Sequence, residues 1–105
     1  MTTVRFFSNG KKLNGFSVIG HSTSNCDDQN GKLVCSAISS AAYMAANTIT
    51  EIVGDKAEIE VADGKMILKV SSPSDKTVAV LEGFKLHIEQ LGQIYSDSIK
   101  INSEV

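Results

Sequence analysis

The sequence has 105 residues, of which 42% are hydrophobic and 21% are charged. This is the size and composition of one globular domain rather than of a disordered, collagen-like or membrane-spanning chain, so we expect a single domain over residues 1–105. The ten basic and twelve acidic side chains are spread along the chain. The sequence therefore lacks the concentrated positive charge that direct nucleic-acid binding requires.

The cellular compartment is predicted from the apolar segments and the cysteines. The first ten residues lack the apolar segment of a secretory signal, and we expect no stretch that approaches the length of a membrane span. We therefore expect a cytoplasmic protein with no membrane partner, and reduced thiols, because disulfides rarely persist in that compartment. Cys26, Cys35, His21 and His87 match no common zinc spacing, so we expect no metal and no cofactor.

The first twenty residues predict a β-hairpin. Apolar residues alternate with more polar ones on both sides of the turn dipeptide Asn9-Gly10. From Ser22 to Gly31 apolar residues almost disappear, which predicts an exposed loop. From Val34 onward they recur every three or four positions, which predicts a helix over about residues 34–53 that ends at Gly54.

The second half of the chain predicts a hairpin, a helix and a strand. Two alternating stretches around Asp63-Gly64 predict a second hairpin, and an apolar stripe from Val78 to Tyr95 predicts a second amphipathic helix. Alternation at Ile99 and Ile101 predicts a closing strand. The predicted order is ββαββαβ, and one sheet with both helices packed against it would bury all the apolar stripes. The predicted fold class is therefore α+β with two layers.

Cys35 is the most informative residue because it lies where the predicted loop ends and the predicted helix begins. Backbone amides at a helix N-terminus favour a thiolate, which is the nucleophile that acyl transfer requires, and amides near Cys35 and Ser36 could stabilise an oxyanion. His21 could act as the base if the loop folds back, and Gly20 allows a close approach beside it. The alternative is that Cys35 only packs in an alanine-rich helix and His21 only ends a strand.

Three segments carry a resemblance to a known family: Gly20-His21 with the polar loop to Gly31, Leu33-Val34-Cys35-Ser36-Ala37-Ile38-Ser39, and Tyr95-Ser96-Asp97-Ser98-Ile99-Lys100-Ile101. Over nearly its whole length the chain resembles the bacterial ribosomal-processing cysteine protease family known as Prp. The resemblance implies a ββαββαβ-like fold, a homodimer, and an endopeptidase. The implied substrate is the N-terminal extension of large-subunit ribosomal protein number twenty-seven, cleaved after an aromatic residue.

The resemblance also implies the roles of individual residues. Cys35 is the expected nucleophile, His21 is the expected general base, and the loop between them is the expected substrate-gated cover. Gly20, Ser36 and Ser39 are the expected substrate-binding residues. Ser39 lies one helical turn beyond Cys35 and on the same face of the helix.

One departure from the family concerns the orientation of His21. The family usually has aspartate three positions before the cysteine, where this chain has Lys32. Asp27 or Asp28 could supply the missing carboxylate, although exposed loop acids more often only aid solubility. Lys32 could itself favour the Cys35 thiolate.

Other functions remain open at this stage. The chain could be a catalytically silent peptide-binding factor in ribosome assembly, a scaffold that acts through dimerisation, or a deamidase or acyltransferase with the same cysteine and histidine chemistry. Cys26 is either an incidental thiol or a partner for Cys35 in a reversible disulfide that silences the enzyme.

Overall fold

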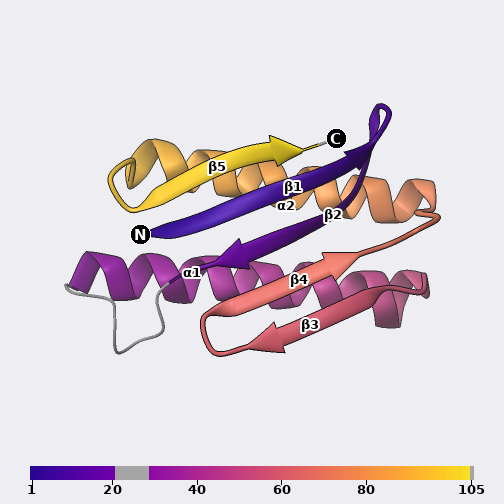
Figure 1. The fold of residues 1–105 in the computed structure, drawn as a ribbon, viewed down its shortest axis with the longest axis horizontal. Helices are drawn as coiled ribbons and strands as arrows, with labels where there is room; N and C mark the ends of the chain where they lie inside the picture. Colours follow the sequence, from indigo (N-terminus) through magenta and orange to yellow (C-terminus); the bar gives the residue numbers. More distant parts are fainter. Residues whose placement is uncertain (21–28, 105) are drawn as a thin grey trace.

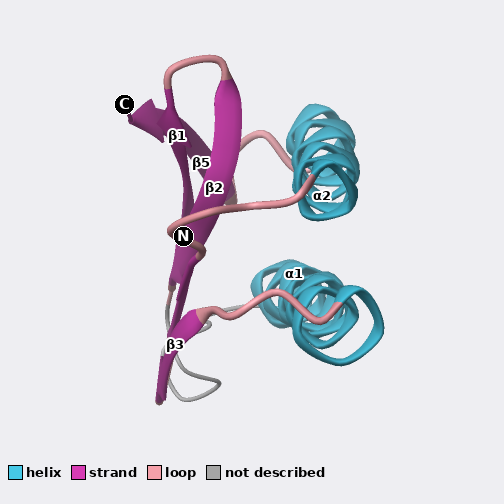
Figure 2. Cartoon of the chain, turned by 90° about the vertical axis from the view of Figure 1, so that its right-hand side faces the viewer, coloured by secondary structure: helices cyan, strands magenta, loops and turns pink. Residues whose placement is uncertain are grey.

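The computed structural model describes residues 1–20 and 29–104, which form a five-stranded sheet with two long helices on one face (Figures 1 and 2). The elements in chain order are β1 (Thr2–Asn9), β2 (Lys12–Ile19), α1 (Gln29–Asn47), the π-helical segment η2 (Thr48–Val53), β3 (Glu58–Ala62), β4 (Lys65–Lys69), α2 (Asp75–Ile94) and β5 (Ile99–Glu104). The predicted α+β fold class, two-layer arrangement and ββαββαβ order are confirmed.

The sheet is mixed, with strand order β3-β4-β2-β1-β5. The two hairpins β1–β2 and β3–β4 are joined by antiparallel pairing of β2 with β4, and β5 adds in parallel to β1. The first hairpin turns between Asn9 and Lys12 and the second turns at Asp63-Gly64, so both turns lie where the sequence predicts them. This order places the β3–β4 turn beside the end of β2, where the backbone N–H of Gly20 donates to the carbonyl of Gly64 at 2.9 Å.

The core lies between the sheet and the helices. Phe6 of β1 and Phe16 of β2 are fully buried, and the ring of Phe84 in α2 packs against both, with centroid distances of 5.7 and 4.5 Å. Val34, Ile38 and other small or branched residues of α1 complete this layer. Burial of this apolar surface is the main favourable contribution to folding.

The edge strand β3 departs from the expected burial. Alternation at Ile59 and Val61 suggested a stripe that the helices would cover, but these side chains are 45% and 53% exposed. All of β3 is exposed, because it lies at the edge of the sheet and pairs only with β4 among the described strands. The alternation of apolar and polar residues therefore predicts the strand correctly, but the expected burial of its apolar side chains is wrong.

The first helix differs from its predicted bounds at its start. α1 begins at Gln29 instead of near residue 34, because polar residues before the apolar stripe also adopt helical conformation. The predicted end at Gly54 is confirmed, because α1 continues into η2, which ends at Val53. Gly54 has φ 86°, in the left-handed region that favours glycine, and its N–H donates to the carbonyl of Ile49 at 3.0 Å.

The stretch Lys32–Val53 is long and apolar enough to cross a membrane by length and composition alone. The expectation that no stretch approaches a membrane span is therefore corrected. In the structure Val34, Ile38 and Ile49 on this stretch are buried in the common core with the sheet and α2. Such packing is typical of a core helix of a globular fold.

Asp55 connects the end of η2 to the start of α2. Its Oδ2 accepts hydrogen bonds from the Thr77 hydroxyl at 2.6 Å and from both the N–H and the hydroxyl of Ser74 at 2.9 Å. Ser74 is also the N-cap of α2, since its hydroxyl accepts from the N–H of Thr77 at 3.3 Å. These donors, Thr77 first, lower the pKa of Asp55 below its ordinary value of 3.8.

We expect Asp55 to make stability depend on pH in acid. Because the pKa is lower in the folded than in the unfolded state, the stabilisation is fully present above the ordinary value of 3.8 and is lost as the pH falls through the lower, folded-state pKa. The free energy of unfolding, measured with urea at pH 7 and below pH 3, should fall less in acid for Asp55→Asn than for the parent, which is a smaller acid loss of stability. Asp97→Asn, at an exposed carboxyl, is the matched control; equal acid losses in the Asp55→Asn and parent proteins would contradict the expectation.

Candidate active site

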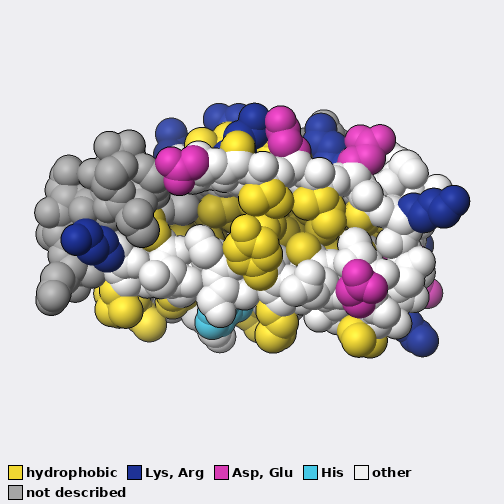
Figure 3. Space-filling view, turned by 90° about the horizontal axis from the view of Figure 1, so that it is seen from below, with side chains coloured by type: hydrophobic (Ala, Val, Ile, Leu, Met, Phe, Trp, Pro, Cys, Tyr) yellow, Lys and Arg dark blue, Asp and Glu magenta, His cyan; other side chains and the backbone are white. Residues whose placement is uncertain are grey.

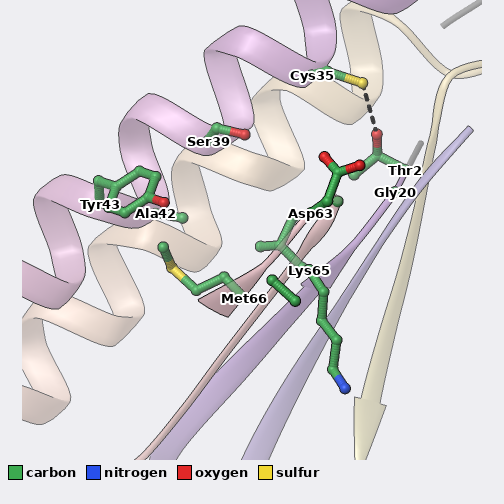
Figure 4. A pocket seen from close by; sticks show the side chains of 12 residues that line it. Thr2, Gly20, Cys35, Ser39, Ala42, Tyr43, Asp63, Lys65 and Met66 are labelled. Atoms are coloured by element: carbon green, nitrogen blue, oxygen red, sulfur yellow. Dashed lines mark hydrogen bonds between the residues drawn. The ribbon is translucent and has the colours of Figure 1, made fainter. Parts of the chain in front are cut away.

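Cys35 lies on α1 at the boundary between the helical layer and the sheet. Its side chain is partly buried, and its Sγ is 3.5 Å from the hydroxyl oxygen of Thr2 at the start of β1 (Figure 4). Thr2 itself is only 3% exposed. The sulfur is therefore held at the edge of the core, next to the first residue of a central strand.

The predicted location of Cys35 at a helix N-terminus is wrong. Since α1 begins at Gln29, Cys35 lies in its second turn. Only the first four amides of a helix lack an intrahelical partner, and the dipole effect is confined to the first turn. Amides at Cys35 and Ser36 belong to the regular helix, so the structure does not support the hypothesis that they form an oxyanion hole.

Cys35 lines a pocket of about 250 Å³ between α1 and the sheet. The lining residues are Cys35, Ser39, Ala42 and Tyr43 of α1, and Thr2, Val18, Gly20, Ala62, Asp63, Gly64, Lys65 and Met66 of the strands and their connections. Figure 4 shows Cys35 and Thr2 at one end and Ala42, Tyr43 and Met66 at the other. The pocket thus combines a nucleophilic end with an apolar end.

The structure brings together three of the residues predicted for the site. Gly20 and Ser39 line the same pocket as Cys35, whereas Ser36 is exposed on α1 and is not among the described lining residues. A β-carbon on Gly20 would lie 2.9 Å from the hydroxyl oxygen and 3.1 Å from the methyl carbon of Thr2. Glycine at this position therefore makes room for the Thr2 side chain.

Sequence reasoning did not identify Thr2, Asp63 or Tyr43 as residues of this pocket. Thr2 gave no signal beyond its place before a predicted strand, Asp63 was assigned only to a turn, and Tyr43 lies between apolar positions of the helix. Figure 4 shows the carboxylate of Asp63 directed toward the Cys35 end, while the amine of Lys65 points away. Lys65 is paired with Glu60 at 3.4 Å. Asp63 therefore gives the nucleophilic end a carboxylate.

An apolar surface continues outside the pocket. Three large apolar side chains are about half exposed or more, namely Tyr43 of α1, Ile52 of η2 and Val61 of β3. Figure 3 shows hydrophobic side chains along the middle of the face that carries α1 and β3. Exposed apolar surface of this kind is typical of interaction sites.

His21, Cys26, Asp27 and Asp28 lie outside the described residues. The contact between His21 and Cys35, the carboxylate that would orient His21, and the redox role of Cys26 therefore stay predictions. Lys32 is exposed on α1. Within residues 1–20 and 29–104, no group of three or more His, Cys, Asp or Glu side chains could hold a metal ion.

A cysteine at one end of a pocket with room for a single side chain is the arrangement expected of a thiol hydrolase. The family model described as cysteine protease Prp matches residues 1–100. The chain belongs to the cysteine protease Prp family and is a cysteine protease, so the resemblance noted in the sequence is confirmed.

Solved structures show the same fold. The essential ribosomal processing protease Prp from S. aureus, in complex with a covalently linked product peptide, has a TM-score of 0.85 and 19% identity, with 99% of this chain and 100% of that chain covered. The same protease with a substrate peptide has a TM-score of 0.85 and 18% identity, with equal coverage. SMU.848 from Streptococcus mutans has a TM-score of 0.83 and 18% identity, with 99% and 96% covered. No curated protein sequence gives a significant match.

Proposed function

We propose that this chain is a cysteine endopeptidase that removes the N-terminal extension of large-subunit ribosomal protein number twenty-seven. The observation that carries the proposal is the position of Cys35 at the nucleophilic end of the pocket in a member of the cysteine protease Prp family. The similar S. aureus structures support the substrate class, since that protein is described as a ribosomal processing protease bound to peptides.

In the proposed reaction His21 takes the proton of the Cys35 thiol, and the sulfur attacks the carbonyl carbon of the scissile bond. The tetrahedral intermediate collapses as the C–N bond breaks, and His21 returns the proton to the leaving amine. Water then attacks the thioester and gives a proton to His21. Cleavage of the C–S bond releases the new carboxyl terminus and regenerates the thiol as the proton returns to sulfur.

The apolar end of the pocket supports cleavage after an aromatic residue. The pocket as a whole has a volume of about 250 Å³, which exceeds the roughly 150 Å³ of a cavity that binds benzene, so it has room for one aromatic side chain. Ala42 and Met66 are buried around this end and can cover the ring. Burial of such a side chain contributes about 1.5–3 kcal/mol, or roughly 10- to 100-fold in kcat/KM if realised in the transition state.

Cleavage of synthetic peptides tests the proposal. A peptide spanning the extension of the organism's own ribosomal protein should be cut once, after the aromatic residue, as read by mass spectrometry. The same peptide with alanine at that residue should be cut about 10- to 100-fold more slowly. Binding of the intact peptide with no cleavage would instead favour the silent assembly factor, and release of ammonia or acyl transfer would favour the other cysteine chemistries.

We further propose that the protein acts in the cytoplasm as a homodimer. An apolar groove of about 680 Å³ between α1 and α2 supports the homodimer, because a second copy of the chain could cover it. The groove is lined mainly by small and apolar residues such as Ala41, Val80 and Phe84. Exposed Met44 and Leu86 lie on the same two helices. Sedimentation equilibrium at micromolar concentration tests the dimer, and a monomer mass would contradict it.

A further inference from the structure

We propose that Thr2 is a positioning residue for the nucleophile: its hydroxyl donates a hydrogen bond to the Cys35 sulfur and holds the thiolate at the pocket. The inference rests on the proposed role of Cys35 and deepens it. The Thr2 hydroxyl oxygen and the Cys35 Sγ are 3.5 Å apart, and either atom could be the donor while the thiol is protonated. Once the thiol loses its proton the sulfur can only accept, so ionisation fixes the hydroxyl as the donor.

Thr2 is held rigidly enough to act in this way. Its backbone N–H donates to the carbonyl of Ser98 at 2.9 Å, and it pairs with Ile99 in the parallel β1–β5 ladder. Its side chain is 3% exposed and packs against the space left by Gly20. A β-branched side chain in such a site has little rotational freedom. The fold therefore directs the hydroxyl at the sulfur, because the Thr2 side chain cannot rotate freely about its Cα–Cβ bond.

The hydrogen bond from Thr2 stabilises the Cys35 thiolate, which the distant N-terminus of α1 does only weakly. Because α1 begins at Gln29, the helix dipole acts only weakly at Cys35. A hydrogen bond to the charged form of a group favours that form, and bonds to ions are stronger than bonds between neutral groups. Thr2 also contacts Gly20, which directly precedes His21 in the sequence. One buried hydroxyl thus links the nucleophile to the end of the strand that precedes the proposed base.

The pH dependence of Cys35 alkylation tests this inference without any peptide substrate. All variants carry Cys26→Ser, and iodoacetamide modification of Cys35 is followed by mass spectrometry from pH 5 to about 10, which spans ordinary thiol ionisation. Thr2→Val keeps the shape of the side chain but lacks the hydroxyl. Its alkylation midpoint should move up by about one pH unit, and its kcat/KM should fall about tenfold.

Two matched variants separate positioning from packing. Thr2→Ser keeps the hydroxyl and should retain the parent midpoint. Thr3→Val changes the neighbouring threonine, which projects from the opposite face of β1, and should also leave the midpoint unchanged. Thr2→Ala provides a second variant without the hydroxyl, should Thr2→Val not fold.

A midpoint that is the same in the parent and in a folded Thr2→Val or Thr2→Ala protein overturns the inference. Equal shifts in Thr2→Ser and Thr2→Val also overturn it, because they would show that the effect comes from packing. The result is independent of substrate identity: a parent protein that cuts no ribosomal peptide would refute the proposed function, while the alkylation profiles would still decide the role of Thr2.

Discussion

Replacing Cys35 with alanine is expected to reduce kcat for cleavage of the extension peptide by roughly four to six orders of magnitude, because loss of the nucleophile removes the covalent route. The side chain is only partly buried, so the change should alter the free energy of unfolding by no more than about 1 kcal/mol. Cys35→Ser should lose nearly as much activity, since its hydroxyl is a weak nucleophile at neutral pH. Mass spectrometry of the peptide and urea unfolding of each protein provide the two measurements.

Cys26→Ser is the matched control for the loss of a thiol. It should cleave the peptide at close to the parent rate, and its sensitivity to peroxide reports on the proposed silencing disulfide. Cleavage by Cys35→Ala at more than about one hundredth of the parent rate would show that another group is the nucleophile. Ser39, the serine of α1 that lines the pocket, would then be the first residue to substitute.

The element order could be predicted because each element buries a repeating set of side chains. In β1 the buried Phe6 has exposed or partly exposed neighbours, and in α2 the buried Leu81, Phe84 and Ile88 recur at helical spacing. A polar segment carries no such pattern, so nothing in the sequence distinguished the end of the loop from the first turns of α1. The placement of Cys35 depended on that boundary and was wrong for this reason.

The partners of Cys35 could not be predicted because periodicity identifies buried positions but does not say which strands pair. Thr2 and Cys35 are separated by 33 positions in the sequence, and only the crossover from β2 to α1 brings them together. Asp63 reaches the pocket because β4 pairs with β2 rather than with β5. The motifs of the Prp resemblance include Gly20, Cys35 and Ser39, which line one pocket, but they contain no information on Thr2.

Gly15 of β2 leaves no room for a side chain beside the backbone of β4, and Gly15→Ala is expected to destabilise the protein by about 3 kcal/mol. The residue is buried and pairs with Phe7 on one side and Lys69 on the other. A β-carbon would collide with the carbonyl oxygen of Leu68 and lie 3.1 Å from the Cα of Lys69. These are backbone atoms of a paired strand, so no change of side-chain rotamer can relieve the overlap.

Gly83→Ala is the control for this substitution, since a β-carbon on that residue of α2 meets nothing within 4 Å. It should raise the free energy of unfolding by about 1 kcal/mol, because alanine has the higher helix propensity. Urea unfolding of both variants measures the contrast, with opposite signs expected for the same chemical change. A Gly15→Ala protein as stable as the parent would mean that β2 and β4 are not paired in this register. The described position of the pocket between the ends of these strands and α1 would then also be wrong.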